Sequence, residues 1–379
     1  PGRSVRRAEP SPTSRDQPTS LPLTVAAPTA GGSGADSVTQ VTVLFATHPE
    51  YLDHVAGAHH PESPQRLQAV ARGVHRADLG EGIVLIEPQP AAIDRLELVH
   101  PADYLNNIRH LVERGGGQLD MDTAVSTGSW NAATRAAGAG LTAIDALRSG
   151  SSDAAFCAVR PPGHHATAIE SMGFCLINNV AVAAASLAEQ GERVMVVDYD
   201  AHHGNGTQDI FYADDRVLYV SLHQWPLYPG TGRASELGAP SAVGTNLNIP
   251  LPAGATGDVY LAAFDRLIAP VADAFGPTWV IISAGFDAHR DDPITELGLT
   301  SADYPALTAR ILSVVPAGRR LVMLEGGYDL AALERSTAAV LRAMAGEAAD
   351  HDEPVTNGGP GMAQLDVIER LLIDAGTIE

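Results

Sequence analysis

Short runs of apolar, often β-branched residues alternate with longer alanine-rich stretches between residues 41 and 345. Several short runs are apolar at successive positions, a pattern typical of strands that are buried on both faces of a parallel sheet. We therefore predict an α/β fold: a single domain, residues 41–345, with a mainly parallel multi-stranded sheet and helices on both faces. The predicted strands are Val41–Ala46, Ile83–Ile86, Ala154–Val159, Val194–Val197, Val217–Leu222, Trp279–Ser283 and Leu321–Leu324, and the predicted helices include Trp130–Leu147, Asn179–Gln190, Val259–Phe275, Ala302–Val315 and Leu330–Met344.

The two ends of the chain have a different composition from this domain. Residues 1–40 are rich in Pro, Ser, Thr, Gly and Ala, which predicts a disordered N-terminal extension or a stretch upstream of the native start. Residues 346–361 are rich in Gly, Pro and Asp and predict a linker. The last part, residues 362–379, predicts a C-terminal helix with an apolar face that packs back on the domain. That face consists of Leu365, Ile368, Leu371 and Leu372.

Charge and cysteine content narrow the class of protein. The 24 basic residues are all arginine, and 45 acidic residues bring the net charge to -21. A chain this acidic argues against non-specific binding to nucleic acid or to an anionic membrane, and solubility explains most of the charge. The sequence contains no apolar run of about 18 residues, so we expect no membrane span. The two cysteines, Cys157 and Cys175, cannot build a disulfide framework, which predicts a reducing, cytoplasmic location.

Polar clusters follow several of the predicted strands, where ligands of such sheets bind. Asp198, Asp200 and His202 occupy alternate positions after one strand, so their side chains can converge on a divalent metal such as zinc. The alternative is a turn in which an aspartate caps the next helix. Asp287 follows another strand and would complete a set of two carboxylates and one imidazole. Such a set leaves a ligand position open for water, as in catalytic zinc sites.

Two further clusters supply groups that could move protons. His164 and His165 follow a Pro-Pro-Gly turn and are candidates for a general base and acid, the alternative being an ordinary surface loop. Tyr328 follows two glycines and could bring its hydroxyl into a cleft, although a packed tyrosine is the ordinary outcome. His289 and Asp291 are expected to be solvated or to support the metal ligands. Together the clusters predict a metal-dependent hydrolase.

The same clusters resemble those of the zinc-dependent histone deacetylases, in particular the bacterial class II-type amidohydrolases of the arginase/deacetylase fold. The resemblance extends over residues 41–345 and rests on seven blocks in the family's order. These blocks are His60–Arg66, Arg160–Ala166, Gly173–Asn179, Asp198–Gly206, Ser221–His223, Ser283–Pro293 and Glu325–Tyr328.

The resemblance implies an enzyme that removes acetyl or other acyl groups from the side-chain amine of acyl-lysine in proteins or peptides. It implies one Zn²⁺ per chain, bound by Asp200, His202 and Asp287. It also implies a structural K⁺ held by backbone groups around Asp198, Ser221 and Leu222. The implied catalytic roles are a general base for His165, an electrostatic or acid role for His164, orientation of these two histidines by Asn205 and Asp198 respectively, and a hydrogen bond to the substrate carbonyl for Tyr328. The implied substrate contacts are Gly173, Phe174 and Tyr228 along an acyl-lysine tunnel, Asp122 and Ile294 at its rim, and Arg66 near its floor.

Departures from related families separate the alternatives. Two-metal arginases carry an acid where this chain has Gly204, and a further acid where it has His289, so a second metal is not expected. Polyamine-selective relatives place an acid near the position of Ile294, whose apolar side chain offers an amine no partner. A compact loop at residues 221–232 predicts a wide tunnel mouth. An acetylpolyamine or other small-molecule N-acyl amidohydrolase, or a non-catalytic binder of acyl-lysine or a metabolite, remains the alternative function. We make no prediction of the oligomeric state.

Overall fold

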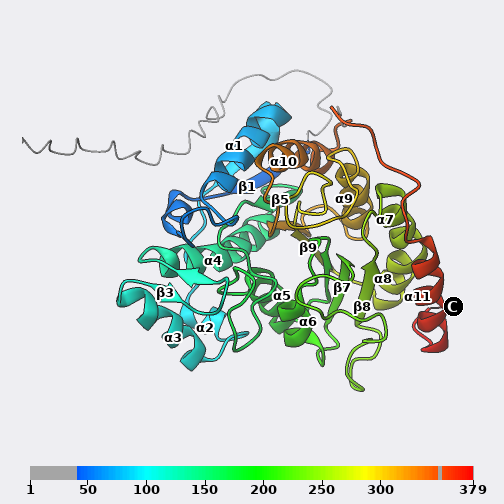
Figure 1. Cartoon of the computed structure of the whole chain (residues 1–379), viewed down its shortest axis with the longest axis horizontal. Helices are drawn as coiled ribbons and strands as arrows, with labels where there is room; N and C mark the ends of the chain where they lie inside the picture. Colours follow the sequence, from blue (N-terminus) through cyan, green and yellow to red (C-terminus); the bar gives the residue numbers. More distant parts are fainter. Residues whose placement is uncertain (1–40, 349–351, 379) are drawn as a thin grey trace, which may run out of the picture.

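Eight parallel strands form the central sheet of the computed structural model, which describes residues 41–348 and 352–378 (Figure 1). The predicted N-terminal extension, residues 1–40, lies outside the described residues. The predicted fold class, a single α/β domain with a mainly parallel sheet, is confirmed. From edge to edge the strands are β2 (Ile83–Ile86), β1 (Val43–Ala46), β5 (Ala154–Cys157), β10 (Arg320–Leu324), β9 (Trp279–Ala284), β6 (Val194–Asp198), β7 (Val217–Gln224) and β8 (Asn246–Leu251).

Helices cover both faces of this sheet (Figure 1). On one face α4 (Ser129–Arg148) packs on α5 (Asn179–Glu189), and on the other α10 (Leu330–Met344) packs between α1 (Gln65–Ala77) and α9 (Tyr304–Ser313). The central strands are therefore buried on both sides, which explains their continuous apolar sequences. The remaining helical segments are η1 (Pro49–Asp53), η2 (Gly80–Gly82), α2 (Ile93–Leu96), α3 (Ala102–Glu113), α6 (Asn205–Phe211), α7 (Gly257–Ala263), η3 (Phe264–Ile268), α8 (Ala269–Phe275) and α11 (Met362–Asp374).

A small antiparallel pair stands apart from the main sheet. It consists of β3 (Gly117–Gln118) and β4 (Ala124–Val125). Residues 119–123 connect the two strands and include Asp120 and Asp122. Asp120 accepts hydrogen bonds from the backbone N–H groups of Asp122 and Thr123, at 2.9 and 2.6 Å, which holds the turn. Among the described residues every helix is too short or too polar to cross a lipid bilayer.

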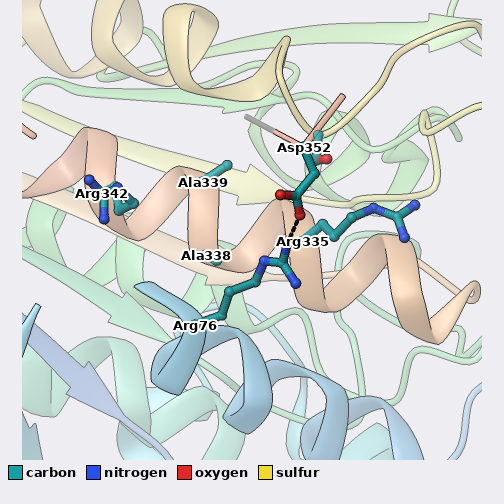
Figure 2. A pocket seen from close by; sticks show the side chains of 7 residues that line it. Arg76, Arg335, Ala338, Ala339, Arg342 and Asp352 are labelled. Carbon is teal, nitrogen blue, oxygen red and sulfur yellow. Dashed lines mark ion pairs between the residues drawn. The ribbon is translucent and has the colours of Figure 1, made fainter. Parts of the chain in front are cut away.

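Residues 352–378 contact the domain at several points. Asp352 pairs with Arg76 of α1, and both line a pocket together with Arg335 and Arg342 of α10 (Figure 2). Glu353 follows and accepts a hydrogen bond from the backbone N–H of Ser301, at 3.1 Å. The final helix α11 then packs against η3, β8 and α7. Its buried side chains are Leu365, Ile368 and Leu372, while Leu371 is partly exposed.

Candidate active site

The three residues predicted to bind zinc meet at one edge of the sheet. Asp200 and His202 follow β6, Asp287 follows β9, and these two strands are neighbours in the sheet. His202 Nδ1 lies 3.1 Å from Asp200 Oδ1 and 3.0 Å from Asp287 Oδ2. The three side chains are buried, and their potential ligand atoms all lie within 4.8 Å of one another. They form a candidate metal-binding group.

The charges in this group fit a bound cation. Burial and the neighbouring Asp200 carboxylate raise the pKa of Asp287 to about 7. Two buried carboxylates this close repel each other, and among the described residues no arginine pairs with either of them. Backbone N–H groups orient both acids: that of Gly326 donates to Asp200 and that of Ala201 to Asp287, each at 2.8 Å. Two oxygen donors and one imidazole are a donor set that suits zinc.

Position 204 has no room for a side chain. A Cβ atom placed on Gly204 would collide with the carboxylate of Asp198 and with the hydroxyl of Tyr219. Tyr219 donates a hydrogen bond to the same carboxylate at 3.2 Å. The backbone here thus leaves no space for the additional acid that a second metal would need. Binding of a single metal per chain stays a prediction.

The two adjacent histidines are held by different partners. His164 Nδ1 lies 2.9 Å from Asp198 Oδ2, and His165 Nδ1 lies 2.8 Å from Asn205 Oδ1. Burial by itself would lower the pKa of His164, but the charges of Asp200 and Asp198 outweigh it and raise the pKa well above its usual value. Burial and the positive charges of His164 and His202 lower the pKa of His165 well below its usual value. One imidazole is therefore held charged and its neighbour neutral.

These side chains open into a cavity of about 230 Å³. Its inner end carries the buried imidazoles of His165 and His202, whereas Tyr228 and Ile294 are 40% and 36% exposed and mark its mouth. The ring of Tyr228 stands edge-on to that of His165, with 5.2 Å between the ring centres. The cavity is lined by Asp122, His165, Gly173, Phe174, His202, Leu227, Tyr228, Ile294 and Tyr328. All the predicted rim and tunnel residues except Arg66 are in this lining.

Gly173 and Phe174 turn the chain sharply at the wall of the cavity. Both adopt positive φ, +55° and +70°. A Cβ on Gly173 would run into the ring of His165, so only glycine lets the backbone pass this close. The strained Phe174 is held by a 3.1 Å hydrogen bond from its N–H to Thr123 Oγ1. Its ring stands edge-on to Tyr328, with 5.8 Å between the ring centres.

Arg66 lies behind the cavity and is fully buried. Its Nε donates to the backbone oxygen of Gly327 at 2.8 Å, and its guanidinium carbon lies 5.0 Å from the ring centre of Tyr328. It also pairs with Glu62, which in turn binds Arg160. Arg66 thus supports the loop that carries Tyr328 and contributes no wall to the cavity.

Two acids that the sequence did not single out hold the catalytic loops in place. Glu325 accepts hydrogen bonds from the backbone N–H groups of Gly163 and His164, at 2.6 and 3.1 Å. Asp292 accepts one from the N–H of Tyr328 at 2.7 Å. Both acids lie within motifs that carried the resemblance, but nothing in the sequence shows that their targets are backbone groups on distant segments.

The predicted potassium site lies where β6 ends, beside the middle of β7. Asp198 and Ser221 are register partners on these strands, and Leu222 follows, fully buried. The hydroxyl of Ser221 lies 2.9 Å from Nδ1 of His223. Potassium binding at this position stays a prediction.

Comparisons with known proteins agree with this geometry. Residues 60–344 match the model of the histone deacetylase domain. A probable deacetylase of Archaeoglobus fulgidus is 40% identical over 306 residues, covering 79% of this chain and 85% of the relative. A histone deacetylase-like amidohydrolase of Pseudomonas aeruginosa is 39% identical over 297 residues, covering 77% and 78%. The crystal structure of the HDA15 HD domain superposes with a TM-score of 0.80 at 35% identity, covering 88% of this chain and 94% of that one.

Proposed function

We propose that this chain, a deacetylase of the histone deacetylase family, removes acyl groups from the side-chain amine of acyl-lysine. In this proposal the reaction depends on zinc. The observation that carries this proposal is the convergence of three kinds of group on one narrow cavity. His202 of the candidate metal-binding group, His165 of the unequal histidine pair and Tyr328 all line this cavity. An acyl-lysine side chain is long and thin enough to enter such a cavity from its mouth.

Asp200, His202 and Asp287 would hold the zinc ion. When bound, zinc acts as a Lewis acid toward the acyl carbonyl and lowers the pKa of water. The remaining chemistry belongs to residues of the chain, and it requires one group that accepts a proton, one group that returns it, and one donor for the carbonyl oxygen.

His165 is the general base in this proposal. The Asn205 side-chain oxygen accepts a hydrogen bond from the N–H at Nδ1, so Nε2 keeps its lone pair on a ring that lines the cavity. An amide oxygen holds this tautomer without adding a negative charge, and the lowered pKa keeps the ring neutral and ready to take a proton from the attacking water.

His164 and Tyr328 complete the set. The Asp198 carboxylate stabilises the charged form of His164, which supplies positive charge close to the reacting atoms and a proton for the leaving amine. The Tyr328 hydroxyl would donate a hydrogen bond to the carbonyl oxygen as negative charge develops there. Burial raises the pKa of Tyr328 well above its usual value, so the hydroxyl keeps the proton that it donates.

The test combines metal content with turnover. The purified protein should contain about one zinc per chain and release acetate, or a longer acid, from acyl-lysine peptides. His165→Ala should lower kcat at least about 100-fold and retain the zinc, as expected for loss of a general base. Tyr328→Phe removes only a hydroxyl and should also slow kcat strongly.

The outcome also decides between substrates. N-acetylated polyamines, assayed in parallel with acyl-lysine peptides, test the small-molecule alternative, which the apolar Ile294 at the mouth disfavours. A zinc-loaded protein that turns over neither class of substrate would overturn the proposal in favour of a binding protein.

A further inference from the structure

A second, larger cavity of about 530 Å³ lies beside the active-site cavity. One wall comes from helix α3, one from the turn between β3 and β4, and one from residues 169–172 after the histidine pair. Its lining consists of Tyr104, Asn107, Ile108, Leu119, Asp120, Ile169, Glu170, Ser171 and Met172. No step of the proposed reaction uses any of these residues.

The linings of the two cavities contain consecutive residues of the chain. Met172 lines the second cavity and the next residue, Gly173, lines the first. Asp120 and Asp122 lie on the same turn and face the second and the first cavity respectively. The Met172 sulfur also accepts a 3.3 Å hydrogen bond from Asn205, the residue that orients His165. The second cavity therefore adjoins the first, near the residues that would flank an acyl-lysine bound there.

The second cavity combines an apolar base with acidic edges. Ile108 is buried, while Leu119 and Met172 are half-buried. Asp120 and Glu170 bring two carboxylates, and the nearby Arg109 is directed instead to Asn106 and Glu113. Within residues 41–348 and 352–378 neither carboxylate has an ion-pair partner, and Ile169 beside them is 65% exposed. The edges of the cavity therefore carry two carboxylates without an ion-pair partner in the described part of the chain, next to an apolar base.

We propose that this second cavity binds a long basic side chain, lysine or arginine, that flanks the acyl-lysine in a peptide or protein substrate. The aliphatic part of such a side chain would lie on Ile108, Leu119 and Met172, and its cationic end would reach Asp120 and Glu170. The inference rests on the proposed function, because it assigns to the acyl-lysine reaction a preference for neighbouring residues.

The experiment compares the turnover of short peptides with a central acetyl-lysine. These peptides carry arginine, alanine or glutamate at one of the two positions before or the two positions after the acetyl-lysine. At one of these positions arginine should raise kcat/KM about three- to tenfold over alanine, through KM, as two partly exposed ion pairs would. The double variant Asp120→Asn/Glu170→Gln should abolish this preference. Asparagine at 120 keeps the oxygen that accepts the two backbone hydrogen bonds of the turn, so the fold should be retained.

Two controls separate the possible outcomes. Turnover of an acetyl-lysine methylamide, which has no flanking residue, should be the same in the double variant and the wild type. Glu81→Gln, which removes one exposed acid that does not line the cavity, should keep the arginine preference. Normal methylamide turnover without an arginine preference would overturn this inference and leave the proposed function intact. A double variant that slows only N-acetylspermidine would also overturn it, because the occupant would then be a small amine.

Discussion

Two groups in this molecule contain the same kinds of side chain and differ in what surrounds them. Asp200, His202 and Asp287 form one, and His289, Asp291 and Glu353 form the other, which we call the C-terminal staple. Each has one imidazole and two carboxylates whose nearest atoms lie within 4.8 Å of one another. Composition and spacing alone would therefore mark both as metal sites.

Countercharge separates the two groups. In the staple, Arg335 lies 3.3 Å from Glu353 and 3.1 Å from Asp291, and Arg290 lies 3.7 Å from Glu353. The staple is thus neutralised by the protein itself and ties the C-terminal segment to the loop that follows Asp287. The candidate metal-binding group has no arginine partner among the described residues; the imidazole of His164, whose Nε2 lies 3.8 Å from Asp200 Oδ1, stands beside it instead, and its two carboxylates remain free to bind a cation.

The largest expected effect comes from breaking the metal-binding group. Asp287→Ala should remove the zinc and lower kcat/KM at least about 1,000-fold, because the Lewis acid contributes several kcal/mol. Elemental analysis and acetate release measure both. The matched variant Asp291→Ala removes an acid from the staple and should keep both zinc and activity. A zinc-loaded, active Asp287→Ala protein would contradict the distinction between the two groups.

Damage to the staple should appear as lost stability. Glu353→Gln weakens the bonds to the buried His289 and to Ser301 and should lower the free energy of unfolding by about 2 kcal/mol. Urea denaturation monitored by fluorescence gives the value. Zinc content should not change, since no staple residue belongs to the metal-binding group. The opposite pattern, zinc loss at unchanged stability, would show that the staple is part of the catalytic centre.

Removal of the countercharge tests the comparison directly. The double variant Arg290→Gln/Arg335→Gln leaves the acids of the staple without arginine partners and should create a second, weak site, so zinc at saturation should rise from one toward two per chain. Calorimetric titration measures the stoichiometry. Arg72→Gln, which removes an arginine paired with Glu334 elsewhere, should leave it at one. A stoichiometry of one zinc per chain in the double variant would mean that the arginine partners are not what prevents the staple from binding metal.

The smallest expected effect is the loss of the stability contributed by Glu353 at low pH. Burial would raise the pKa of Glu353, but hydrogen bonds from Ser301 and His289 outweigh it and lower the pKa to about 2. A carboxyl whose pKa is lowered by folding stabilises the protein above its unfolded pKa, and this contribution disappears as the pH falls through the folded value. The stability difference between wild type and Glu353→Gln should therefore be full near pH 6 and shrink steadily toward pH 3. Urea unfolding at several pH values measures it, and a constant difference would contradict the assigned pairing.

Much of the fold follows from local sequence. The predicted strand Trp279–Ser283 is β9, and the predicted helix Leu330–Met344 matches α10 to the residue, because continuous apolar runs and amphipathic stretches report burial directly. Strand β8 was not predicted. It lies at the sheet edge, and its Asn246 and Asn248 direct their amides to Gln208, while Pro250 is a residue that only edge strands accommodate. Its sequence therefore lacks the apolar run that marked the other strands.

The role of a site residue could be predicted where it follows from the residue type. It could not be predicted where it depends on a contact with a distant segment of the chain. Strand-end clusters and the family blocks pointed to Asp200, His202 and Asp287, and the structure brings them together. Solvation, one of the two expectations for His289, is wrong for that residue, because it is fully buried against Glu353, 64 residues away along the chain. Arg66, expected near the tunnel floor, supports Tyr328 from behind.

Residue types and their periodicity were enough to predict the α/β class, the family and the groups that could do chemistry, because both are local properties. Which acids are paired with arginine, and which are left for a cation or a substrate, became visible in the folded arrangement alone. Pairing depends on distances between segments that no local pattern records, and a charge in a buried position is stable only with the partner that folding brings to it.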